Sequence, residues 1–209
     1  MEFEKIFENN ESWRQAQLKN DPKYFESLAE GQSPSTLYIG CADSRVTAEQ
    51  ILGAEPGDLF VHRNVANCVP NIDISGQSTV NYAVAHLKVK HIVVCGHYEC
   101  GGVAAAMQPK DLGILNPWLR NIRDVYRLHQ DELEGITDED KRYRRLVELN
   151  VQEQCINVMK TPEVQLAFRS NELEIHGFVF DIGTGKLINL DLKFEQYLER
   201  IADVYRLER

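Results

Sequence analysis

Three short apolar runs, rich in β-branched side chains, constrain the fold of this chain more than any other feature. They are LYIG before Cys41, LFVH at 59 to 62 and HIVVCG at 91 to 96, and their length and composition are typical of buried strands. Helical patterns lie between and after them, with apolar residues recurring on one face of residues 78 to 90 and of residues 143 to 159. This alternation predicts right-handed βαβ units around a parallel sheet.

The two ends of the chain add further elements. EIHGFVFD and KLINLDL flank IGTGK, whose glycines suit a tight reversal and predict a hairpin with an antiparallel edge strand. Residues 2 to 18 and 22 to 30 read as helices, the second capped by Asp21 with Pro22 at its first position. The polar residues 129 to 145 are interpreted as a solvated loop leading into a helix.

We therefore expect a single α/β domain with a central, mostly parallel sheet of about four parallel strands plus an antiparallel edge strand, flanked by helices. The α/β domain is assigned to residues 31 to 209 and an N-terminal helical arm to residues 1 to 30. The arm carries many large apolar side chains, so we expect it to pack on a partner subunit.

Charge and hydropathy narrow the class of partner. Lys and Arg total 23 against 32 for Asp and Glu, a formal net charge of -9, which argues against nucleic acid and anionic membranes and favours a small-molecule substrate. No apolar run is long enough to span a bilayer, and residues 1 to 10 lack the basic flank and apolar stretch of a signal peptide. We expect a cytoplasmic protein.

Two motifs follow predicted strands directly: CADSR from Cys41, and HYECGG from His97, which includes Cys100. Carboxyl ends of parallel strands meet at one edge of a sheet, so folding can bring the motifs together. Two thiolates and one imidazole suit Zn²⁺, and three protein ligands leave one position open, as in catalytic zinc sites. We predict a site with one Zn²⁺ per subunit.

Asp43 and Arg45 are one residue apart, so their side chains can form a charge-assisted pair beside the metal. Arg45 would keep Asp43 ionised, and Asp43 would accept a hydrogen bond from zinc-bound hydroxide or, if released, bind zinc itself. Two thiolates and a neutral imidazole cancel the charge of the ion, so its water should be a weaker acid and reactivity should favour mildly alkaline pH. The other three cysteines, Cys68, Cys95 and Cys155, are expected to be reduced, small buried side chains.

The motifs C-x-D-S-R and H-x-x-C-G-G resemble those of the β-class carbonic anhydrases, most nearly the bacterial subgroup. The resemblance continues through residues 45 to 67 to Gly102 and more loosely over most of the chain. It implies that Cys41, His97 and Cys100 bind zinc, that Asp43 and Arg45 form a dyad, and that carbon dioxide is hydrated reversibly to bicarbonate. It also implies a homo-oligomer, a dimer or a tetramer.

The resemblance further implies a narrow, largely apolar substrate cleft shared between subunits, to which it assigns Gln32, Val46, Phe60, Val65, Tyr82 and the backbone of Gly101. Members of the bacterial subgroup also bind a second bicarbonate in a pocket of Trp, Arg and Tyr. Here Arg63 is retained, but the other two positions are Tyr38 and Phe180. These departures put that regulatory pocket in doubt.

Three alternative functions stand beside this one. The same scaffold could hydrolyse carbon disulfide or carbonyl sulfide, which turnover assays would distinguish. A non-catalytic zinc or thiol sensor would not require the pair of Asp43 and Arg45. Nucleophilic catalysis by Cys100 with His97 explains the distant Cys41 less well than zinc does.

Overall fold

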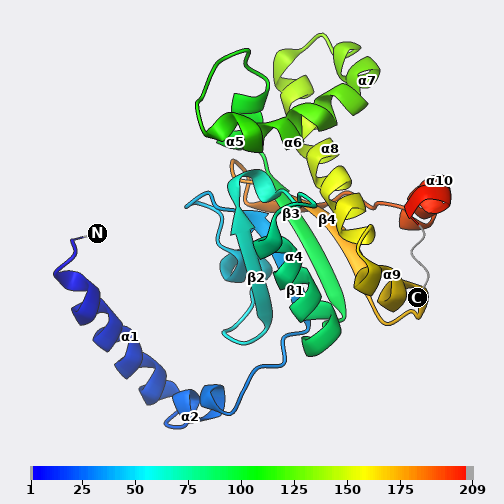
Figure 1. Cartoon of the computed structure of the whole chain (residues 1–209). Coiled ribbons are helices and arrows are strands. Elements are labelled where there is room, and N and C mark those ends of the chain that lie inside the picture. The colour runs from blue at the N-terminus through cyan, green and yellow to red at the C-terminus, as the bar shows by residue number, and fades with distance from the viewer. Residues whose placement is uncertain (1, 206–209) are drawn as a thin grey trace. The chain divides into compact units, whose positions relative to one another are not determined.

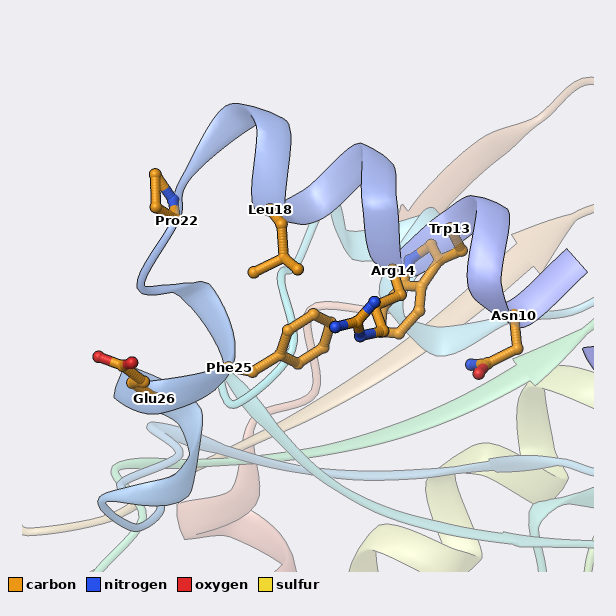
Figure 2. A pocket seen from close by; sticks show the side chains of 7 residues that line it. All are labelled: Asn10, Trp13, Arg14, Leu18, Pro22, Phe25 and Glu26. Atoms are coloured by element: carbon orange, nitrogen blue, oxygen red, sulfur yellow. The ribbon is translucent and has the colours of Figure 1, made fainter.

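The computed structural model describes residues 2–205, and the chain forms two compact units, Met1–Ser33 and Pro34–Arg209. The smaller unit contains α1 (Lys5–Asn20) and α2 (Tyr24–Ala29). Trp13 of α1 packs edge-on against Phe25 of α2, with ring centroids 5.5 Å apart, and side chains of both helices line a hollow of about 440 Å³ beside these rings (Figure 2).

The second helix begins later than predicted. The Asp21 carboxylate accepts a hydrogen bond from the Lys23 backbone N–H at 2.9 Å, which forms a turn at Pro22, and α2 starts only at Tyr24. Asp side chains compete for backbone N–H groups in this way at helix starts.

The larger unit is built on a sheet with the strand order β2-β1-β3-β4-β5. The first four strands are mutually parallel and β5 pairs antiparallel with β4, which confirms the predicted sheet and its edge hairpin. The strands are β1 (Thr36–Cys41), β2 (Leu59–Asn64), β3 (His91–His97), β4 (Glu174–Asp181) and β5 (Lys186–Asn189).

Helices occupy the connections, as the alternating pattern predicted. They are α3 (Ala48–Leu52), η1 (Val65–Asn67), α4 (Ile74–Asn81), η2 (Tyr82–Leu87), α5 (Gly101–Ala106), α6 (Leu115–Leu128), α7 (Gln130–Glu134), α8 (Glu139–Met159), α9 (Pro162–Arg169) and α10 (Phe194–Tyr205).

One face of the sheet carries the main core. The helix α8 contacts β3 and β4 on this face (Figure 1), and Val151 of α8 is fully buried there. Gly96 of β3 permits the close approach, because a Cβ at this position would lie 2.6 Å from Cγ2 of Val151. The opposite face has a smaller cluster around Tyr38, Val93 and Cys95.

The polar segment before α8 is not simply a loop. Residues Gln130–Glu134 form α7, and Leu133 within it is completely buried. The prediction of a solvated loop was therefore wrong here, because one leucine among many charged residues anchors a short helix to the core. Asp138 then caps α8 by accepting hydrogen bonds from the N–H groups of Asp140 and Lys141, each at 3.0 Å.

Within residues 2–205, none of the helices combines the length and apolar character needed to cross a bilayer.

Candidate metal centre

The two motifs meet at the carboxyl edge of the sheet. Cys41 ends β1 and His97 ends the neighbouring parallel strand β3, and Cys100 is the N-cap residue of α5. The three side chains are buried and offer a nitrogen and two sulfurs within 4.8 Å of one another. The Sγ atoms of Cys41 and Cys100 are 4.0 Å apart. This arrangement is compatible with the binding of one metal ion.

The imidazole of His97 is held in one orientation and one tautomer. Its Nδ1 lies 2.8 Å from the Tyr98 backbone carbonyl, which can only accept, so the ring proton is on Nδ1. The other nitrogen, Nε2, is buried and has no hydrogen-bond partner in the described part of the chain. A buried nitrogen lone pair without a donor is costly to leave unsatisfied, and a metal ion would satisfy it.

The pKa values of the cysteine thiols set Cys41 apart from the structural cysteines. The hydrogen bond between the two thiols of Cys41 and Cys100 lowers the pKa of Cys41 and raises the pKa of Cys100. In contrast, burial raises the pKa of Cys68 to about 12 and that of Cys95 to about 11. A cysteine that forms a thiolate readily is the kind that binds metals. All five cysteines are buried and none forms a disulfide within residues 2–205, and the predicted burial of Cys68, Cys95 and Cys155 is confirmed.

Asp43 and Arg45 form a bidentate pair beside the three donors. Nε and Nη2 of Arg45 donate to the two carboxylate oxygens of Asp43 at 2.9 and 2.7 Å. These hydrogen bonds hold the pKa of Asp43 well below its usual range. Oδ2 of Asp43 is 3.8 Å from Nε2 of His97, so the carboxylate borders the space that the donors surround.

Two supporting contacts were not predicted from the sequence. Glu99 has a left-handed backbone, with φ 63°, and its carbonyl accepts a hydrogen bond from Nη2 of Arg45 at 3.1 Å. The Tyr143 hydroxyl donates to the Cys100 carbonyl at 3.2 Å. The turn at Glu99 was missed because no glycine occupies this left-handed position. The contact of Tyr143 was missed because the sequence places this residue only on an apolar helix face.

Arg63 holds the loop after β1 in place. Its Nε donates to the Cys41 carbonyl at 2.8 Å, and its Nη2 donates to the carbonyls of Asp43 and Val46, each at 2.7 Å. Tyr38 is fully buried, and its hydroxyl has no hydrogen-bond partner among the residues described. Phe180 pairs in register with His97 across β3 and β4.

Of these three residues, Arg63 has a side chain that already donates hydrogen bonds to backbone carbonyls.

The cleft residues predicted in the larger unit differ in their exposure to solvent. Phe60 and Tyr82 are neighbours, with ring centroids 5.7 Å apart, and Tyr82 and Val65 are exposed although apolar. Val46 is fully buried. Gly101 is exposed, and apart from its chain neighbours and its own helix backbone no described atom lies within 4 Å of where a Cβ would stand.

Gln32 is exposed and belongs to the smaller unit. Its role toward substrate stays a prediction.

Comparison with known proteins decides the family. Residues 36–187 match the sequence profile of the family described as carbonic anhydrase. The chain belongs to the β-class carbonic anhydrases. It is therefore an enzyme, a carbonate dehydratase.

Individual relatives agree with this family over nearly the whole chain. A carbonic anhydrase of Emericella nidulans is 56% identical over 99% of this chain and 91% of its own length. A tetrameric β-carbonic anhydrase of Sordaria macrospora, 43% identical, superposes with a TM-score of 0.87 over 91% of this chain and 97% of its own. The β-carbonic anhydrase CafA of Aspergillus fumigatus, 39% identical, gives 0.91 over 99% of each chain. All three are fungal, and the likeness to the bacterial subgroup stays a prediction.

Proposed function

We propose that this carbonic anhydrase hydrates carbon dioxide reversibly to bicarbonate and a proton, using one zinc ion per subunit held by Cys41, His97 and Cys100. The observation that carries the proposal is the buried Nε2 of His97, which has no hydrogen-bond partner among residues 2–205, in a cluster with two thiols. Family membership supports the reaction, and the donor set supports the metal.

The spacing of the donors suits zinc. Zinc–sulfur bonds of about 2.3 Å in a tetrahedral site place two sulfurs about 3.8 Å apart, close to the 4.0 Å between the Sγ atoms of Cys41 and Cys100. Three protein donors leave one coordination position for a reactant, which is typical of catalytic rather than structural sites. When bound, zinc supplies a Lewis acid that increases the acidity of a coordinated water.

Asp43 is proposed to orient the nucleophile. Arg45 keeps the Asp43 carboxylate ionised. Asp43 could therefore accept a hydrogen bond from the attacking water or hydroxide and orient a lone pair of that oxygen toward the substrate carbon. If the hydrogen bonds to Arg45 break, the same carboxylate can instead become a fourth ligand. The distance of 3.8 Å from Nε2 of His97 is compatible with either role.

The substrate is proposed to enter an apolar cleft lined by Phe60, Val65 and Tyr82, with the Gly101 backbone N–H as a polar contact. Val46 is fully buried and would support this cleft without lining it, and Gln32 stays a predicted polar contact. A cleft of this kind suits a small neutral molecule because it excludes water from the substrate's position. Val65 and Tyr82 are 38% and 46% exposed in the single chain, which favours a second subunit that covers them.

We also propose a homo-oligomer, a dimer or tetramer, supported by the tetrameric relative from Sordaria macrospora. A cytoplasmic location stays part of the proposal.

A stopped-flow assay of carbon dioxide hydration, run on protein whose zinc content has been measured, tests this function. We expect hydration in proportion to bound zinc, rising between about pH 6 and about pH 9 because two thiolates weaken the acidity of the coordinated water. Zinc-loaded protein that turns over only carbon disulfide or carbonyl sulfide would overturn the proposal in favour of the related hydrolase. Loaded protein inactive on all three gases would indicate a sensor.

A further inference from the structure

A second group of potential metal ligands lies at the opposite end of the same strands. His91 begins β3 and Glu174 begins β4, and the two residues are paired in register. His176 follows two positions after Glu174, so its side chain emerges on the same face of the sheet. His97, at the other end of β3, is about 20 Å away at the usual rise per strand residue. The cluster is therefore separate from the centre described above.

The donor atoms of this second cluster already have the spacing of a metal site. Nδ1 of His91 is 3.2 Å from Nε2 of His176. Oε2 of Glu174 is 3.8 Å from the former nitrogen and 3.6 Å from the latter. Bonds of about 2.0 to 2.2 Å to a tetrahedral zinc ion place such atoms about 3.3 to 3.5 Å apart. The Glu174 side chain is 71% exposed and is free to close the small excess.

The surroundings favour a bound ion that solvent can reach. The side chains of His91 and His176 are 42% and 28% exposed. The ring of Phe178 stacks on His176, with centroids 5.8 Å apart, and limits the rotation of that imidazole. Two imidazoles and one carboxylate form a ligand set that proteins use for zinc and related divalent transition ions.

We propose that His91, Glu174 and His176 bind a second divalent transition-metal ion, of the zinc class, which links the starts of β3 and β4. This site has no thiolate, so it binds more weakly than the centre at Cys41 and fills after it. The inference goes beyond the proposed carbon dioxide hydration and does not depend on it.

Equilibrium dialysis of the metal-free, full-length protein against increasing Zn²⁺, with bound metal counted by mass spectrometry, tests the proposal. We expect two ions per subunit in the wild type and one in the His91→Asn and His176→Asn variants. Glu174→Gln should weaken the second ion by roughly tenfold or more, because it removes the anionic ligand. His129→Asn is the matched control, since the His129 imidazole hydrogen-bonds the Glu153 carboxylate, at 3.0 Å, and belongs to neither cluster, so this variant should bind two ions.

Cobalt substitution provides a readout that does not depend on total metal. Thiolate ligands give cobalt an intense charge-transfer absorption, whereas an imidazole and carboxylate site gives only weak bands. Both His variants should therefore retain the thiolate absorption, which also shows that they fold, while they lose the second equivalent. Saturation of the wild type at one ion per subunit would overturn the proposal and would indicate a hydrogen-bonded histidine pair. A second ion that persists in both variants would overturn it as well.

Discussion

Nη2 of Arg45 donates a hydrogen bond of 3.1 Å to the backbone carbonyl of Glu99. The same guanidinium holds both carboxylate oxygens of Asp43. Arg45 thereby ties the loop after β1 to the turn that carries Cys100, and links the orientation of Asp43 to the geometry of the metal centre.

Arg45→Lys should lower the rate of hydration much more than it lowers zinc content. Lysine retains the positive charge but cannot bind both carboxylate oxygens in a fork and reach the Glu99 carbonyl as well. We expect kcat/KM to fall by about tenfold or more, equivalent to about 1.4 kcal/mol of lost orientation. Stopped-flow assays on zinc-counted protein measure this. Arg127→Lys is the control, since Arg127 makes only an exposed pair with Asp124, at 3.4 Å, in the described chain. Equal activity of wild type and Arg45→Lys would contradict the role.

Tyr143→Phe should loosen the metal centre without removing a ligand. The substitution deletes the hydrogen bond to the Cys100 carbonyl, and such a bond contributes about 0.5 to 1.5 kcal/mol. We expect a chelator to remove the metal about two to ten times faster from the variant. Tyr126→Phe on α6 serves as the comparison and should release metal at the wild-type rate. No change in the Tyr143 variant would show that this contact does not support the ligand.

The mostly parallel sheet and its edge hairpin could be predicted because apolar runs such as HIVVCG and the glycines of IGTGK carry strong local signals. The three metal candidates could be predicted because Cys41 and His97 end parallel neighbours. The backbone conformation and the helix that surround these residues could not be predicted. Glu99 takes a left-handed backbone that its residue type does not announce, and α7 depends on a single leucine whose burial is a tertiary effect.

Leu133→Ala should reveal the structural importance of α7. Truncation of a completely buried leucine typically lowers the free energy of unfolding by about 2 to 5 kcal/mol. Leu128→Ala is the matched control, because Leu128 is 62% exposed and should cost less than about 0.5 kcal/mol. Urea unfolding at one fixed protein concentration compares them, since oligomers gain stability with concentration. Equal urea midpoints for both variants would show that the packing of α7 does not stabilise the fold.

Asp138 should make stability depend on pH in the acid range. Hydrogen bonds from the N–H groups of Lys141 and Asp140 lower the pKa of its carboxyl below the usual 3.8. The folded state therefore binds this proton less readily than the unfolded state, and the stabilisation is present above about pH 4 and is lost as pH falls through the folded pKa. Asp138→Asn keeps a capping oxygen but cannot titrate.

Urea midpoints of wild type and Asp138→Asn, measured from about pH 6 to about pH 3, test this expectation. The advantage of the wild type should shrink toward the acid end. A difference in urea midpoint that stays constant from about pH 6 to about pH 3 would show that it does not arise from titration of the Asp138 cap.

The charge-transfer absorption of the cobalt-substituted enzyme tests most directly whether both sulfurs bind one ion. The account predicts an intense thiolate band in the wild type and in Cys155→Ala, whose buried thiol lies on α8, and a clear loss of intensity in Cys41→Ser and in Cys100→Ser. A band of wild-type intensity in either serine variant would contradict the metal centre on which the proposed function rests.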